Sequence, residues 1–229
     1  MLPDQDDATV RVLIDPADHQ NVPRAVKLFQ AIDQLADLDT NTCLTPINEK
    51  VLDAIMILRQ VINAFIKPFI LPDLSLSAQL IWLSKCAHLL FALHRLHGTS
   101  FMSNALYADL QSVVKTVVFC IAKQKELDDT QPFYLYQIGT DRLEQLFGEV
   151  RTANHDPNVD AKQLGERLAS ALAMSGIFMD HPEWKRTQCR LSYNNSEGAD
   201  HVNPRYFMNE LTVSSVCLAT VWKSGRIEA

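Results

Sequence analysis

The sequence predicts a mainly α-helical protein with a few short strands near its C-terminal end. Apolar residues recur every three or four positions through most of residues 22–178, which is the spacing of one buried helix face. Proline, glycine, serine and asparagine separate these stretches at positions where helices begin and end. Residues 210–222 depart from this pattern because they are rich in β-branched side chains, which favour strands.

The composition indicates a globular protein. With 229 residues, of which 47% are hydrophobic, the chain can form one large domain or two small ones around a substantial core. The formal net charge of -6 argues against a free-standing nucleic-acid-binding module, because such modules usually carry a basic surface. A local basic face remains compatible with this charge.

The cysteines and the N-terminus predict an intracellular protein, either nuclear or cytoplasmic. The cysteines are odd in number, far apart and without a C-x-x-C pair, so reduced thiols are expected rather than a disulfide framework or a zinc ribbon. Residues 1–7 are acidic and lack the basic-then-apolar order of a signal peptide. The longest apolar stretches are broken by Lys, His or Pro before they reach the length of a membrane span, so no membrane partner is expected. The five cysteines are Cys43, Cys86, Cys120, Cys189 and Cys217.

The first elements are a short strand and a helix. The β-branched run at residues 10–14 predicts the strand, which a turn at residues 15–18 ends. Asn21 and Pro23 are start signals for a helix over residues 22–38. Residues 40–46 form a polar linker.

Three longer helices follow. Helical spacing predicts one over residues 48–66, which the Lys67–Pro68 pair ends. The next begins at Ser75 or Ser77, reaches Gly98, and is apolar on more than one face, as expected of a central helix. The last covers residues 104–125. The inward-facing residues expected on the three helices are Val51, Ile55, Leu58, Ile62, Phe65, Trp82, Leu89, Leu90, Leu93, Leu106, Leu110, Val113, Val117 and Ile121.

The C-terminal half contains a brief strand, two helices and a final strand. Residues 133–138 predict the brief strand, residues 160–178 a helix, and residues 210–222 the final strand. The organisation we expect is an N-terminal segment (1–21), a helical domain (22–131), a motif helix with the helix after it (132–180), and a loop and strand region (181–229).

The run Gly139–Thr152 predicts a helix with two acids near its start. Thr140 is a suitable N-cap, and Asp141 suits the positive end of the helix dipole. Asp141 and Glu144 are three residues apart, so their carboxylates lie on one face. This arrangement fits either a divalent-metal site or a well-capped helix start. The apolar stripe expected on this helix is Leu143, Leu146, Phe147 and Val150.

The expected orientation of the helix within Gly139–Thr152 can be tested at Phe147. If its ring is buried in the core, Phe147→Ala should cost about 3–5 kcal/mol of stability.

Other familiar sites are absent from the sequence. It has no G-x-G-x-x-G, no G-x-x-x-x-G-K-[ST] and no G-x-S-x-G, and its seven glycines leave little from which to build a phosphate loop. No nucleotide cofactor is therefore expected. The histidines lack a third metal ligand or an activated nucleophile, so packing and loop hydrogen bonds are the better interpretation. This applies to five of the seven histidines in the chain, namely His88, His94 and His97 on one helix, and His181 and His201 after aspartates.

A short basic segment follows an aromatic residue late in the chain. Lys185, Arg186 and Arg190 come after Trp184, a combination that suits either contact with a nucleic-acid backbone or plain solvated surface.

The motif resembles the segment that carries the last catalytic acid in P-element-like transposases, relatives of the hAT group. The shared order is S/T-x-D-x-x-E-x-x-F-[SG]-x-[IV]-R, and the chain also resembles a group of fungal, mobile-element-derived proteins with a Gly-Thr-Asp-Arg-Leu-Glu-x-Leu-Phe-Gly core. Residues 154–158 and Gln163 resemble the connector and helix that follow the acid in those enzymes. The matching residues of the motif are Thr140, Asp141, Glu144, Phe147, Gly148, Val150 and Arg151.

The resemblance implies the C-terminal part of an RNase H-like core behind a helical insertion. In such enzymes three carboxylates hold two Mg²⁺ ions, which activate the attacking oxygen and stabilise the leaving oxygen of a phosphodiester. By resemblance, Glu144 is the third acid and metal ligand, Asp141 caps its helix or acts as an auxiliary acid, and Arg142 and Arg151 contact DNA phosphates.

The resemblance is incomplete in one respect that affects activity. The first two catalytic aspartates of such an enzyme lie on strands, and only the short predicted strand before Asp15 precedes the helices here. Mg²⁺ is therefore expected only if other aspartates complete the site. The first hypothesis is a piece of a metal-dependent DNA strand-transfer enzyme, inactive alone, with DNA and another transposase polypeptide or a second copy as partners. The second is a non-enzymatic helical module that binds protein or DNA.

Overall fold

A computed structural model describes residues 7–14, 22–34, 46–139, 146–148, 150, 160–181, 184 and 206–229. The chain divides into two compact units. The first unit consists of Met1–Tyr136 with Leu191–Ala229, and the second of Gln137–Arg190. Within the described ranges the regular elements are α-helices and short 3-10 turns, so the prediction of a mainly helical protein is confirmed.

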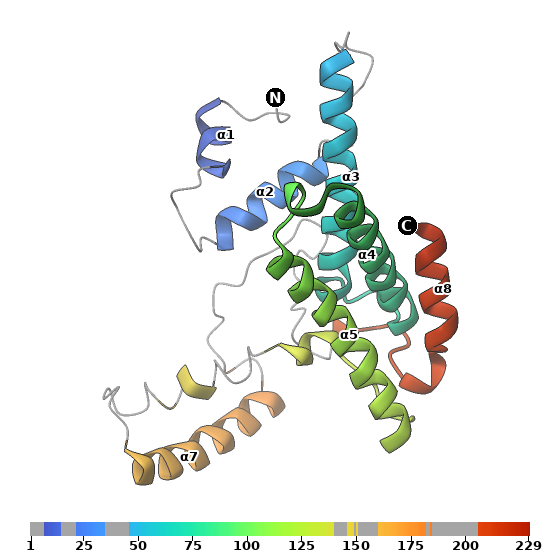
Figure 1. Cartoon of the computed structure of the whole chain (residues 1–229). Coiled ribbons are helices and arrows are strands. Elements are labelled where there is room, and N and C mark those ends of the chain that lie inside the picture. Colours follow the sequence, from blue (N-terminus) through green and yellow to red (C-terminus); the bar gives the residue numbers. More distant parts are fainter. Residues whose placement is uncertain are drawn as a thin grey trace. The chain divides into compact units, whose positions relative to one another are not determined.

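Helix α4 (Leu76–His97) is the centre of the first unit. It contacts α3 (Pro46–Ile70), α5 (Asn104–Leu127) and α8 (Leu218–Glu228), as Figure 1 shows. Because α4 is covered by three helices, apolar residues are buried around much of its circumference. The predicted central helix is thereby confirmed.

The ends of α4 follow from its sequence. The Ser75 hydroxyl accepts a hydrogen bond from the Ala78 N–H at 3.3 Å and so caps the first turn. At the other end Gly98 has a φ of 56°, a left-handed value that favours glycine. The 3-10 turn η2 (Gly98–Ser100) follows directly. Ser103 caps α5 in the same way, accepting from the Leu106 N–H at 3.2 Å.

One hydrophobic cluster of the described residues lies between α3 and α4. Its fully or nearly fully buried members come from both helices, and a ring of partly buried residues packs around them. Ala64, Cys86 and Leu90 have no exposed surface. The buried members are Val61, Ala64, Cys86, Leu89 and Leu90.

The N-terminal residues form helices rather than a strand and a helix. Residues 10–14, predicted as a strand, belong to α1 (Asp7–Ile14), so that prediction is wrong. Helical spacing puts Val10 and the buried Leu13 on the side that faces α2 (Val22–Gln34). The contact with α2 outweighs the strand preference of the β-branched residues. The start of the predicted helix 22–38 is confirmed, and residues 35–45 lie outside the described part.

Helix α3 continues through the proline that was expected to end it. Pro68 lies inside the helix and is almost completely buried. The regular hydrogen-bonding pattern resumes after it, because the Leu71 N–H donates to the Lys67 carbonyl at 3.0 Å. Burial of the ring in the core compensates for the lost backbone bond. The expected inward stripe is also wrong in part, since Val51 is 54% and Leu58 38% exposed.

The two predicted C-terminal strands reduce to one contact among the described residues. Pro132 and Thr212 form an isolated antiparallel bridge, flanked by the bond from Phe133 N–H to the Leu211 carbonyl at 2.9 Å. Proline has no N–H to donate, so a longer ladder is not formed there. Most of the other residues of these segments belong to η3 (Leu135–Ile138), η6 (Val213–Ser215) and α8.

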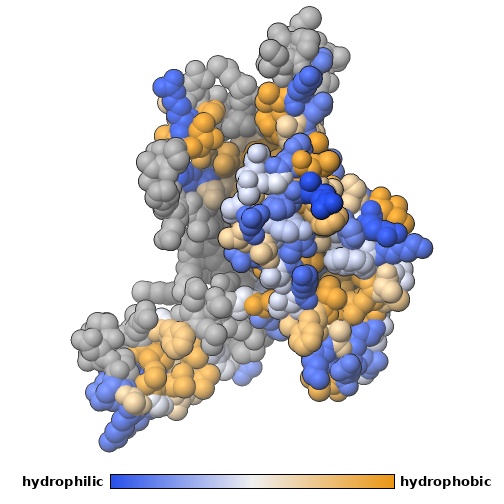
Figure 2. Space-filling model, in the orientation of Figure 1, coloured by the Kyte–Doolittle hydropathy of each residue, from blue (hydrophilic) through white to orange (hydrophobic). Residues whose placement is uncertain are grey.

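The second unit contains α7 (Ala161–Asp180), which confirms the helix predicted over 160–178. The Asp160 carboxylate caps it by accepting from the Gln163 N–H at 2.7 Å. Ala171 is buried, whereas Leu172 is 55% exposed, so only part of the expected stripe faces inward. Figure 2 shows apolar side chains on the surface of this segment (orange, lower left).

Two described helices meet the length and composition of a membrane span. They are Leu76–Ser100, whose apolar window is 50% buried inside the protein, and Asn104–Leu127, whose window is 17% buried. Contacts with α3 and α8 bury the first of these helices, and a core helix of a soluble protein meets the same criterion.

Candidate functional site

The motif identified in the sequence is described only in part. Leu146–Gly148 and Val150 are helical, and Val150 is buried with 2% of its surface exposed. The candidate acids Asp141 and Glu144, and the candidate DNA contacts Arg142 and Arg151, lie outside the described residues. The same holds for the basic segment Lys185, Arg186 and Arg190. Their proposed roles stay predictions.

Phe147 does not have the environment that the sequence predicted. Its side chain is 48% exposed, so the expected burial is wrong. Val150, three residues later, occupies the buried side instead. The loss of stability expected for Phe147→Ala falls accordingly below the range for a buried ring.

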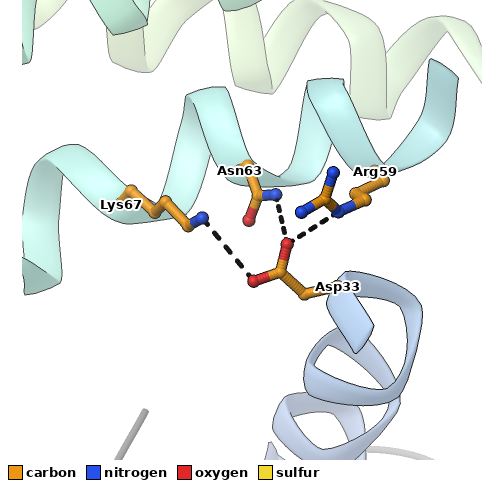
Figure 3. A network of polar contacts seen from close by, with 4 residues as sticks. All are labelled: Asp33, Arg59, Asn63 and Lys67. Atoms are coloured by element: carbon orange, nitrogen blue, oxygen red, sulfur yellow. Dashed lines mark hydrogen bonds and ion pairs between the residues drawn. The ribbon is translucent and has the colours of Figure 1, made fainter. Parts of the chain in front are cut away.

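A polar cluster of described residues joins α2 to α3. Asp33, near the end of α2, faces Arg59, Asn63 and Lys67, which lie on one face of α3 at intervals of four residues (Figure 3). Arg59 Nε donates to Asp33 Oδ1 at 2.8 Å, and Asn63 Nδ2 donates to the same oxygen at 2.7 Å. Lys67 Nζ lies 3.6 Å from Asp33 Oδ2 and 5.9 Å from the centroid of the Trp82 ring.

These contacts set the charge state of Asp33. Partial burial raises the pKa of its carboxyl, but hydrogen bonding from Asn63 and the positive charges of Lys67 and Arg59 outweigh burial and hold the pKa below its ordinary value of 3.8. The carboxylate is therefore ionised at neutral pH and links the two helices.

Asp33 gives the stability a defined pH dependence. Because its pKa is lower in the folded state, its contribution is complete above pH 3.8 and is lost as the pH falls through the folded-state pKa. At pH 7 we expect Asp33→Asn to lower the free energy of unfolding by about 1 kcal/mol. The value is small because water reaches Asp33 and its cationic partners and screens their attraction. Below both pKa values the variant and the wild type should have equal stability. Urea unfolding across this pH range measures the difference, and a constant gap down to the lowest pH would contradict the assignment.

A second polar site lies where α5 meets the start of α8. An open groove of about 490 Å³ is lined by α5 and by residues 214–218. Lys125 Nζ donates to the Val216 carbonyl, and Cys217 is exposed beside it. Hydrogen bonds from the hydroxyl and N–H of Thr220 hold the pKa of the Cys217 thiol below its usual value, with a smaller contribution from Lys125.

The cysteines should therefore differ strongly in reactivity. Burial raises the pKa of Cys86 to about 12, while Cys217 is exposed with a lowered pKa. Since the thiolate is the nucleophile, we expect iodoacetamide at pH 7.5 to alkylate Cys217 on the order of 100-fold faster than Cys86. Timed peptide mass spectrometry measures both rates. Thr220→Val should slow labelling of Cys217 and Thr220→Ser should not; equal rates for Cys86 and Cys217 would refute this environment.

Two histidines of α4 have packing roles. His94 stacks on Tyr107 with ring centroids 4.2 Å apart, and His88 Nδ1 lies 2.8 Å from the Ser84 carbonyl oxygen. His88 also contacts the Trp222 ring of α8. In the described part of the chain, no three His, Cys, Asp or Glu side chains gather closely enough to hold a metal ion.

Sequence reasoning missed both polar sites. The spacing of Arg59, Asn63 and Lys67 is visible in the sequence, but their partner Asp33 is 26 residues from Arg59, and only the packing of α2 on α3 brings it there. Cys217 was assigned to a strand, so its place before a helix was not foreseen.

No family model, curated protein or solved structure matches this chain.

Proposed function

We propose that this chain derives from a P-element/hAT-like transposase and carries the last metal-binding acid of an RNase H-like core, without catalysing a reaction by itself. The observation that carries the proposal is the order Thr140, Asp141, Glu144, Phe147 and Arg151 in one predicted helix. The helical character of Leu146–Gly148 and the helix that starts after Asp160 are compatible with it.

The chemistry explains why activity alone is not expected. Two-metal strand transfer needs several carboxylates around both Mg²⁺ ions, since Mg²⁺ prefers hard oxygen ligands. Glu144 is one such ligand, and Asp141 in the first turn acts as a cap or auxiliary acid. Further aspartates from another polypeptide or a second copy would complete the site. Arg142, Arg151 and the Lys185–Arg190 segment would then contact DNA phosphates.

A nicking assay tests the catalytic part of the proposal. We expect the purified chain, with Mg²⁺ or Mn²⁺, to leave supercoiled plasmid uncut. Suppose instead that the chain nicks the plasmid in a metal-dependent way, that Glu144→Gln abolishes nicking, and that Glu126→Gln, an exposed acid used as the control, does not. This result would show independent activity and overturn that part of the proposal.

The derivation itself is tested by the genomic sequence upstream of Met1. Two aspartates at the ends of predicted strands there would support it, and unrelated coding sequence would count against it.

The second proposed function is a non-enzymatic helical interaction module, and it requires that exposed apolar side chains of the first unit act together as one surface. Leu96, Phe119 and Ile227 are 75%, 69% and 73% exposed on three helices of the first unit. Clustered apolar surface often marks a protein-binding site, whereas isolated exposed residues are ordinary.

Sedimentation equilibrium separates the two cases for self-association. If these residues form an interface between copies, Phe119→Ser should shift the chain toward the monomer. Phe147→Ser, at a half-exposed position of the second unit, should not. A monomer at all concentrations, with no effect of either change, would remove self-association from this alternative.

A further inference from the structure

The contacts around Asp33 leave much of the donor capacity of α3 unused. Arg59 has five N–H donors, and its bond to Asp33 uses the Nε–H. Lys67 Nζ, at 3.6 Å, is farther from the carboxylate than a direct hydrogen bond requires. The four side chains together carry a formal charge of +1, since two cations face one carboxylate. A larger anion with more oxygens would satisfy this set of donors more fully.

Asn63 adds a third donor that is aimed at the same carboxylate. It is 94% buried, because 6% of its surface is exposed, and its Oδ1 has no hydrogen-bond partner. Burying an unpaired acceptor is unfavourable, so the side chain is oriented at some cost to aim its Nδ2 donor at an anion. The Trp82 ring beside Lys67 further restricts the position of the ammonium group.

The carboxylate that now occupies these donors belongs to a helix whose described apolar side chains are mostly half-buried. Among the described side chains of α2, Ala31 is the only buried apolar one. The Asp33 carboxylate is not part of the core between α3 and α4, so exchanging it for another anion does not require that core to open.

We propose that Arg59, Asn63 and Lys67 form a phosphate-binding site on α3, and that Asp33 occupies it in this structure as a tethered competitor. Phosphate offers more acceptor oxygens than a carboxylate and up to twice its negative charge, and it suits both the fork of Arg59 and the point charge of Lys67. A competitor on the same chain is present at high effective concentration, so it weakens binding of free phosphate. This proposal is independent of the transposase derivation.

The test is an NMR titration of the full chain with inorganic phosphate at constant ionic strength, following the Arg59 Nε–H and Asn63 side-chain amide signals. We expect Asp33→Ala to bind phosphate at least about tenfold more tightly than the wild type. Asp33→Asn, which preserves shape and removes the charge, should change affinity in the same direction. Circular dichroism confirms that each variant is folded.

A second substitution identifies the residues responsible. In the Asp33→Ala background, Lys67→Gln should return phosphate affinity to the wild-type level. Lys123→Gln, which removes the same charge from an exposed position on α5, should leave it unchanged within about twofold. No gain in affinity for either Asp33 variant would overturn the proposal. An equal loss from Lys67→Gln and Lys123→Gln would also overturn it, because it would indicate nonspecific charge attraction.

The source of the phosphate is distinguished by a parallel titration with a DNA duplex of about 20 base pairs. If the site binds a nucleic-acid backbone, Asp33→Ala should also gain affinity for the duplex. Lys67→Gln should then make the duplex affinity less dependent on salt concentration, by an amount equal to the loss of about one phosphate contact. If the natural ligand is a free phosphate, the gain should be confined to inorganic phosphate. Either result supports the site, and the absence of both gains refutes it.

Discussion

Replacing Leu90 with alanine should produce the largest loss of stability of any single change considered for this chain, about 2–5 kcal/mol. Leu90 lies on α4 in the core shared with α3, has no exposed surface, and packs among Val61, Ala64 and Cys86. Truncation removes its apolar contacts and leaves a cavity that two long helices cannot easily close. Urea unfolding followed by circular dichroism measures the change.

The neighbouring residue provides a matched control. Phe91 follows Leu90 on the same helix but is 58% exposed, so Phe91→Ala removes more carbon atoms from a site that water already reaches. We expect it to cost less than about 1 kcal/mol. Equal losses for the two variants would show that α4 does not present Leu90 to the core.

The helices that could be predicted from sequence are those with both a clear apolar period and a cap. Ser75 and Gly98 mark the ends of α4, and Asp160 begins α7. Pro68 was misleading because a proline ends a helix only when burial does not compensate for the lost hydrogen bond, and the extent of burial depends on α4.

The C-terminal strand prediction failed for a related reason. Val213, Val216 and Val221 are buried, as their apolar character indicated, but Val213 lies in a 3-10 turn, Val216 directly follows that turn, and Val221 lies in α8. Strand preference reflects packing on a sheet as much as backbone conformation, and the described residues offer no sheet for these valines to join. Packing of the 3-10 turn against α5 and of α8 against α4 therefore decides their conformation.

The polar sites show a similar limit. The sequence contains the row of Arg59, Asn63 and Lys67 on α3, but their significance depends on Asp33 from α2. A contact between residues so far apart in sequence cannot be derived from periodicity. The motif around Glu144 is the opposite case, since its interpretation depends on residue order alone and its acids lie outside the described part of the chain.

Gly225→Ala should destabilise the protein by about 1–3 kcal/mol, although alanine is the better helix former. Gly225 lies in α8 where that helix crosses α4. A Cβ at this position would overlap the Cβ of Ser84 and lie 2.5 Å from the Ile81 carbonyl oxygen. Neither atom is the end of a flexible side chain, so α8 must move away from α4. That movement would also strain the 2.8 Å hydrogen bond from Ser84 Oγ to the Trp222 carbonyl.

Gly176→Ala separates this steric effect from helix propensity. Gly176 is also helical, but a Cβ there would have no neighbour within 4 Å. The same substitution should therefore stabilise α7 by about 0.5–1 kcal/mol, as expected when an exposed helical glycine is replaced. Opposite signs for the two variants in thermal and urea unfolding would establish that α8 is held against α4 by close backbone approach at Gly225. Stabilisation by both would mean that the two helices do not approach so closely, and the link from Ser84 to Trp222 would then lose its structural basis.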